Sequence, residues 1–225
     1  MFNSVFLIIS LIYVTDLCLF VPKYTRCKYD HTDRKRKLVW KGVCIGIPFL
    51  ILTAGALILF LTGFRDSDPA LILLPLGMLI CAIGDIVIEI RFTKGGFLFG
   101  FAHLVYITSE YLMLREMHAA SIVCFLILAI MGLLMTLKFL GKKHRGLMIA
   151  YNTVISASFA LGLGLVLQNV NGQVLVGFGI MSLGISDWLL ARNKTFGSNY
   201  AMSLISLIFY FGGQIMISTY PYLIQ

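Results

Sequence analysis

Long apolar runs dominate this sequence and limit what it can fold into. Each run has about 20 residues, enough for a helix to cross the hydrocarbon core of a bilayer. Inside a bilayer every backbone N–H and C=O needs an internal partner, and a helix supplies one. Charged residues make up only 12% of the chain, whereas a soluble domain has about twice that fraction. The sequence therefore predicts an integral membrane protein made of helices.

Eight such runs fit into the 225 residues with short loops between them. We expect a single all-α domain over residues 1–225, a bundle of eight transmembrane helices. The first run has no basic segment before it and no small-residue cleavage pattern, so we expect a retained helix and not a signal peptide. The expected spans are residues 3–21, 38–63, 70–90, 97–114, 119–140, 147–167, 174–191 and 200–224.

The basic residues predict the orientation of this bundle. Sixteen of the 18 Lys and Arg lie in or beside the loops that follow spans one, three, five and seven. Because cytoplasmic loops of membrane proteins are enriched in Lys and Arg, these loops are expected in the cytosol. Both termini then face the non-cytosolic side. The net charge of +8 comes from the basic residues of these loops, which set the topology and contact lipid head groups. We therefore expect no nucleic-acid partner.

The five cysteines do not indicate a disulfide framework or a zinc site. Their number is odd and no CxxC pair occurs. The four histidines do not cluster, and there is no HExxH motif, GxSxG motif or P-loop. We interpret the cysteines as small apolar packing residues and expect no metal ion or cofactor.

Two aspartates lie within the apolar runs, Asp85 in span three and Asp187 in span seven. A charged side chain near the bilayer centre costs about 2.5–3.5 kcal/mol on insertion scales, so it needs a partner, water or a function. Each acid can be a structural group that is hydrogen-bonded to neighbouring helices. Two acids at matching depth, together with a histidine, favour a polar functional pocket.

Other polar side chains fall at the depth of these two acids, in the cytosolic half of the membrane. Asp85 lies about 9 Å from the cytosolic end of span three, at a rise of about 1.5 Å per residue. Glu89 shares the face of Asp85, although it can also be a solvated acid at the helix end. His103, Tyr106 and Glu110 share one face of span four, and Tyr210 and Gln214 share one face of span eight. The candidate set beside the two aspartates is Glu89, His103, Tyr106, Tyr151, Tyr210 and Gln214.

Two further acids are expected near the membrane surfaces. We interpret Asp16 as an interfacial residue at the end of span one. Glu110 follows Tyr106 on the same face of span four, and we expect it to pair with Arg115 at the far interface.

Two neighbouring carboxyl groups in a low-dielectric pocket can divide the work of acid and base catalysis. Burial disfavours the charged form, and each charge disfavours the other, so one group can hold a proton while the other is ionised. Such a pair suits cleavage through an oxocarbenium-like state or hydrolysis by an activated water. An intramembrane aspartyl protease also uses two aspartates, but its Gly-x-Gly-Asp pattern is missing because Ala82 precedes Ile83-Gly84-Asp85.

At these motifs the chain resembles the YhhN-type lysoplasmalogenases, a family of multi-span membrane proteins, from about Lys41 to the C-terminus. The family often has Lys-Pro where this chain has Lys41-Gly42, so we give Lys41 no role in the site. The stretches that carry the resemblance are Gly84-Asp85, Phe99-Gly100-Phe101-Ala102-His103-Leu104-Val105-Tyr106, Tyr151, Ile185-Ser186-Asp187-Trp188-Leu189-Leu190-Ala191 with Phe196, and Tyr210-Phe211-Gly212-Gly213-Gln214.

The resemblance implies hydrolysis of the vinyl ether bond of lysoplasmalogens, with Asp85 and Asp187 as catalytic acid and base. The other candidate residues are then expected to position water and the lysophospholipid substrate. For a eukaryotic protein the resemblance also implies the endoplasmic reticulum membrane. Two alternatives remain: a transporter that uses the acids as a proton or cation relay, and a non-enzymatic scaffold whose polar residues hold helices together.

Overall fold

The computed structural model describes residues 2–29, 34–61, 69–139, 142–170, 172–197 and 199–224, and the regular secondary structure in these ranges is helical. The elements in chain order are α1 (Phe2–Thr15), the π-helical segment η1 (Asp16–Phe20), α2 (Val21–Tyr29), α3 (Arg34–Leu61), α4 (Ala70–Ile90), α5 (Phe92–Met113), α6 (Ala119–Phe139), α7 (Lys142–Gln168), α8 (Gln173–Phe196), α9 (Tyr200–Ser218) and α10 (Tyr220–Leu223).

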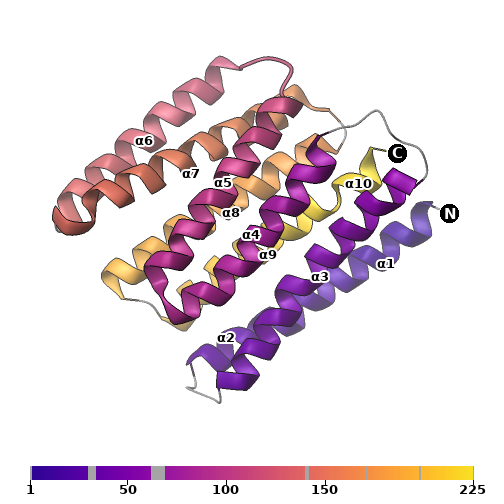
Figure 1. The fold of residues 1–225 in the computed structure, drawn as a ribbon, viewed down its shortest axis with the longest axis horizontal. Coiled ribbons are helices and arrows are strands. Elements are labelled where there is room, and N and C mark those ends of the chain that lie inside the picture. Colours follow the sequence, from indigo (N-terminus) through magenta and orange to yellow (C-terminus); the bar gives the residue numbers. More distant parts are fainter. Residues whose placement is uncertain are drawn as a thin grey trace.

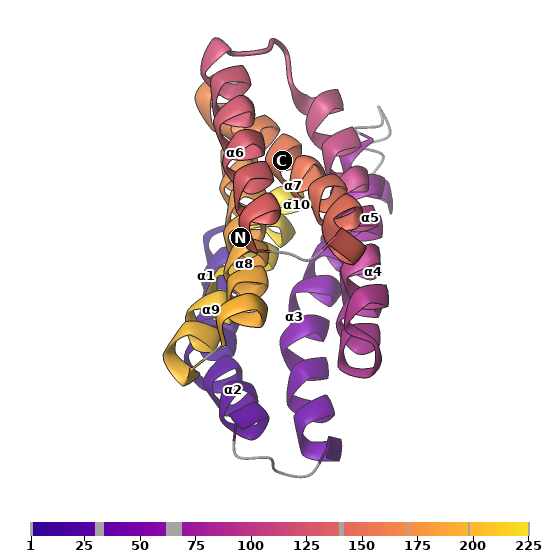
Figure 2. The same ribbon diagram turned by 90° about the vertical axis from the view of Figure 1, so that its left-hand side faces the viewer.

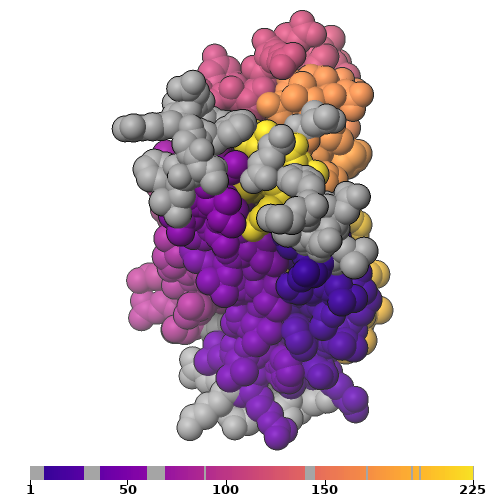
Figure 3. All heavy atoms as spheres, turned by 90° about the vertical axis from the view of Figure 1, so that its right-hand side faces the viewer, coloured from indigo at the N-terminus to yellow at the C-terminus, as the bar shows by residue number. Residues whose placement is uncertain are grey.

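The helices lie side by side in one bundle, with α1 to α3 at one edge and α6 at the other (Figures 1 and 2). The start of α1 and the short α10 lie toward the same end of the bundle. At that end the C-terminal residues pack on α3, where the Tyr222 hydroxyl donates a hydrogen bond to the carbonyl of Ile51 over 2.8 Å. Figure 3 shows the face on which the N-terminal helices meet this C-terminal segment.

Seven helical segments in the described ranges are long and apolar enough to cross a membrane, which confirms a multi-span helical membrane protein. The helix α5 is not one of the seven, although its 22 residues are as many as a span needs. Its composition is less apolar because it carries Lys94, His103 and Glu110. The prediction of eight spans therefore depends on α5, which packs against α4 and α7 along the bundle.

The boundaries of two predicted spans were wrong. Span one was expected to end at Val21, but α1, η1 and α2 continue as one helical segment to Tyr29. Span four was expected to begin at residue 97, directly after Gly95-Gly96, yet α5 begins at Phe92 and includes both glycines. A Cβ atom at Gly95 would lie 2.5 Å from the Cα atom of Ile88. This glycine therefore allows α4 and α5 to approach closely, and it does not end a helix.

The bundle is apolar outside and partly polar inside. Large apolar side chains such as Leu11 and Ile72 are exposed, as expected for a surface that meets lipid. Buried polar residues occur on most of the long helices, Gln214 among them. Close helix contacts use small residues: a Cβ atom at Gly179 of α8 would lie only 2.7 Å from the carbonyl oxygen of Gly213 on α9. Neighbouring backbones thus meet closely enough for short polar side chains to reach partners across the helix seams.

The eight-span arrangement predicts that both ends of the chain lie on the non-cytosolic side. A glycosylation acceptor sequence added at either terminus is expected to be modified in microsomal membranes, because the basic loops between the spans hold the opposite side in the cytosol. An acceptor inserted between residues 141 and 146 serves as the control and is expected to stay unmodified. If only one of the two termini is modified, α5 does not cross the membrane and the span count is seven.

Candidate functional site

Asp187 stands at the centre of a three-helix cluster inside the bundle. It lies on α8 and is 6% exposed. His103 of α5 places Nε2 3.0 Å from Oδ2 of Asp187, and Tyr151 of α7 donates its hydroxyl to the same oxygen over 3.0 Å. The pair with His103 is ionic when the imidazole carries both protons. Both donors use Oδ2, which leaves Oδ1 for other partners.

Asp85 has its own buried partners. Its Oδ2 accepts a hydrogen bond from the Tyr210 hydroxyl of α9 over 2.5 Å, and its Oδ1 lies 3.2 Å from Nζ of Lys41 on α3. The same ammonium group donates to the backbone carbonyl of Asp85 over 2.6 Å. All three residues are buried, with no more than 6% of each exposed. The carboxylate is therefore neutralised by a lysine within the bundle.

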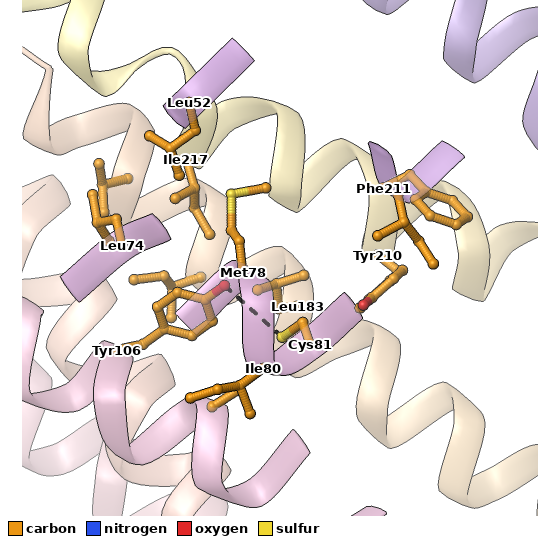
Figure 4. Close-up of a cluster of buried hydrophobic side chains, with 14 of the residues drawn as sticks. Leu52, Leu74, Met78, Ile80, Cys81, Tyr106, Leu183, Tyr210, Phe211 and Ile217 are labelled. Atoms are coloured by element: carbon orange, nitrogen blue, oxygen red, sulfur yellow. Dashed lines mark hydrogen bonds between the residues drawn. The ribbon is translucent and has the colours of Figure 1, made fainter. Parts of the chain in front are cut away.

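Cys81 and Tyr106 connect the two acidic clusters. Cys81 lies one turn before Asp85 on α4, and its sulfur is 3.9 Å from the hydroxyl of Tyr106 on α5 (Figure 4). The Tyr106 ring in turn meets the ring of His103 edge to face, with 6.1 Å between centroids. The thiol of Cys81 lies within range of electrostatic interaction with both aspartates. The two carboxyl groups thus belong to adjacent clusters in one buried polar region.

A cavity of about 460 Å³ lies beside the Asp187 cluster, bounded by α5, α7 and α8 with one residue of α4. Asp187 and Tyr151 form its polar wall, and Asp187 is the one charged side chain among the described residues of its lining. Asp85 is not part of that lining. The cavity residues are Ile88, Phe92, Thr93, Gly96, Phe97, Phe99, Gly100, Phe101, Leu104, Leu147, Met148, Ala150, Tyr151, Val154, Asp187, Leu190, Ala191 and Thr195.

The structure places the other predicted site residues as follows. His103 and Tyr151 contact Asp187, Tyr210 contacts Asp85, and Tyr106 lies between the two clusters. Gln214 is one turn beyond Tyr210 on α9 and is 1% exposed, and its Nε2 has no hydrogen-bond partner in the described part of the chain. The side chain of Glu89 lies outside the described residues.

Two expectations about peripheral acids were wrong. Asp16 is not interfacial: it begins the π-helical turn and is fully buried beside the thiol of Cys44. Glu110 does not pair with Arg115 but is fully buried, and it accepts a hydrogen bond from the Ser158 hydroxyl over 3.2 Å. Asp16 was misplaced because the first helical segment continues past Val21 to Tyr29. Glu110 was misplaced because a position along one helix does not show which neighbours surround the side chain.

Sequence reasoning also missed Lys41. It was counted with the basic loop, yet it lies inside α3 and is only 4% exposed. Its position near the start of the predicted span 38–63 was an available signal, because a lysine there can turn inward toward an acid. Asn152 was missed as well. Its Oδ1 accepts a hydrogen bond from Nε1 of Trp188 over 3.2 Å, which fixes α7 against α8 next to Tyr151 and Asp187.

These features define a class: a multi-span helical membrane protein with paired acidic clusters beside an apolar cavity. Comparison with protein-family models identifies the group within that class. The model of the YhhN family matches residues 44–219, so the chain belongs to the YhhN family. Searches of the curated proteins and of the solved structures found no match. Both aspartates lie inside the matched region, whereas Asp16 and Lys41 precede it.

The Lys41–Asp85 pair makes a prediction about stability. Lys41→Met is expected to lower the free energy of unfolding in detergent by about 3–5 kcal/mol, because it leaves a buried carboxylate without its cation. Asp85→Asn alone is expected to destabilise for the converse reason, while the double variant recovers much of the loss. Lys94→Met removes an exposed lysine and serves as the control. If the effects of the two single variants add in the double variant, the pair is not coupled.

Proposed function

We propose that this protein hydrolyses the vinyl ether bond of lysoplasmalogens. The products are a fatty aldehyde and glycerophosphoethanolamine or glycerophosphocholine. The observation that carries the proposal is Asp187, held by His103 and Tyr151, at the polar wall of an otherwise apolar cavity. Membership of the YhhN family supports the same reading, since the resemblance of its motifs implies this reaction.

The position of the cavity supports a substrate that arrives from the bilayer. Three residues along one edge of the cavity, Phe97, Phe101 and Leu104, are 67%, 53% and 46% exposed. This edge of α5 faces outward, where lipid surrounds the bundle. A single-chain lipid can therefore enter sideways between α5 and α7 without leaving its leaflet. Arg91 and Lys94 are exposed at the start of α5 and are available to contact the lipid phosphate.

The proposed chemistry begins with protonation of the enol ether. In the starting state Asp187 carries a proton on Oδ1, the oxygen that does not contact His103 or Tyr151, and passes it to the carbon of the double bond that is remote from the ether oxygen. The neighbouring carbon becomes an oxocarbenium ion, which the Asp187 carboxylate stabilises. The ion pair of Asp85 with Lys41 and its hydrogen bond from Tyr210 hold α3, α4 and α9 together beside the reacting cluster. In this mechanism Asp187 acts directly on substrate, and Asp85 supports it from behind Cys81 and Tyr106.

Water then completes the cleavage. As a water oxygen bonds to the oxocarbenium carbon, Asp187 takes up one of its protons, which restores the starting protonation of the site. The resulting hemiacetal breaks its carbon–oxygen bond to glycerol, giving the aldehyde and the free hydroxyl. No proton is gained or lost overall. Tyr151 keeps the carboxylate in place through both steps, and Gln214 and Tyr106 are candidates to order water.

A proton or cation relay is the second candidate function. It is favoured by Asp16 and Glu110, because neither has an ion-pair partner among the described residues. Release of aldehyde from a vinyl ether lysolipid separates the two candidates, since a transporter has no reason to cleave the lipid. We place the enzyme in the endoplasmic reticulum membrane as part of the same proposal.

The test is turnover by aspartate variants of the purified protein in detergent. Asp187→Asn is expected to reduce aldehyde release by about 10²–10⁴-fold, because the amide can neither give nor take the proton. Asp85→Asn is expected to inactivate the enzyme as well. Asp16→Asn removes a buried acid outside the cavity and is the matched control that keeps activity.

Activity is compared only among variants whose thermal stability equals that of the wild-type protein, so that loss of folding is not mistaken for loss of catalysis. A lysolipid with an alkyl ether in place of the vinyl ether is expected to stay intact, since it cannot form the oxocarbenium ion by protonation. Wild-type protein that releases no aldehyde contradicts the proposed function. An active Asp187→Asn variant contradicts the mechanism.

A further inference from the structure

The cavity occupies one end of the bundle. Its lining starts at Phe92, the first residue of α5, and reaches Thr195, the last but one residue of α8. The start of α5, the start of α7 and the end of α8 meet at this end (Figure 1). Eight residues separate Asp187 from Thr195, which is about 12 Å along a helix. The space between Asp187 and the helix ends is therefore part of the cavity.

This position sets the direction of a bound lysolipid. Helix ends lie near the lipid head groups, and the middle of a helix lies among the acyl chains. A lipid whose cleaved bond is at Asp187 therefore places its head group toward Thr93 and Thr195, and its chain leaves past Leu104 and Val154. The length between Asp187 and Thr195 is comparable to an extended glycerophospho head group.

The chemistry of this end of the cavity selects among head groups. Thr93 and Thr195 contribute hydroxyl groups, Phe92 and Phe97 contribute aromatic rings, and no described lining residue there carries a carboxylate. Aromatic faces attract cations, and they are the usual binding partners of quaternary ammonium groups. A primary ammonium has three N–H donors that need acceptors, whereas a choline ammonium has none. The lining thus suits choline better than ethanolamine.

Gly96 lines the cavity at this end and adds no side chain to it. A Cβ atom at Gly96 would meet no other atom within 4 Å, so a larger side chain there would extend into open space beside the lipid. Gly100, one turn deeper, differs: a Cβ atom there would lie 3.2 Å from Cδ2 of Tyr151. Gly96 therefore borders the lipid itself, and Gly100 gives room to the tyrosine that holds Asp187.

We propose that the segment of the cavity between Asp187 and the helix ends binds a phosphocholine head group, with Gly96 keeping it wide enough and Phe92 and Phe97 contacting the ammonium. This inference rests on the proposed function for the orientation of the lipid. It makes Gly96 and Phe97 the residues that determine head-group specificity, and it assigns them no part in the chemical step.

The experiment compares Gly96→Leu and Phe97→Leu with two matched controls. Gly46→Leu fills another position with free space around its Cβ atom, and Phe178→Leu replaces another exposed phenylalanine; neither lines the cavity. Binding of a non-cleavable alkyl-ether lysophosphocholine and of its ethanolamine counterpart is measured for each variant. The KM and kcat for the two vinyl ether lipids are measured in parallel.

Phe97→Leu is expected to weaken binding of the choline lipid by about three- to tenfold, the size of one cation–π contact. Gly96→Leu is expected to weaken it by a similar factor, because the added side chain leaves less room for the trimethylammonium group. Both variants are expected to change binding of the ethanolamine lipid by less than about twofold. The kcat for cleavage is expected to be unchanged, and the controls resemble wild type. Equal losses for both head groups, or wild-type protein that does not bind the choline lipid, overturn the proposal. Protein that binds with the expected pattern but releases no aldehyde supports the head-group site and contradicts the proposed hydrolysis.

Discussion

The arrangement of six helices depends on how the bundle compensates the buried charges of Asp85 and Asp187. An ionised carboxylate among apolar helices is costly unless a cation or several donors lie close to it. Asp85 meets this condition with Lys41 and Tyr210, and Asp187 meets it with His103 and Tyr151. Each partner comes from a different helix. The two acids therefore fix how α3, α4, α5, α7, α8 and α9 lie relative to one another.

The two clusters are alike in chemistry but differ in access. Asp187 borders a cavity that reaches the lipid-facing edge of α5, whereas Asp85 lies behind Cys81 and Tyr106 and is held by a lysine. This asymmetry gives the two acids separate roles within the proposed hydrolysis, with one in reach of a lipid and one holding neighbouring helices in place. The end of the cavity that we propose for the head group is lined by uncharged residues such as Gly96.

Much of the site was predictable from spacing along single helices. Residues three, four or seven positions apart share a helix face, so the grouping of His103 with Tyr106 and of Tyr210 with Gln214 followed from the sequence. Lys41 and Asn152 were missed for a physical reason. Each contributes through a partner on another helix, Asp85 and Trp188, and the spacing within one helix contains no information about rotation toward a neighbour.

The sequence by itself determined that the chain is a multi-span helical membrane protein, because apolar runs of bilayer length permit no other spanning structure for a single chain of this kind. It also determined which polar residues share a helix face, since the α-helix has 3.6 residues per turn. Only the tertiary structure decided which acid borders the cavity, why Gly95 lies within a helix and how Asp16 is buried. Those outcomes depend on the rotation and close packing of helices, which long-range contacts set.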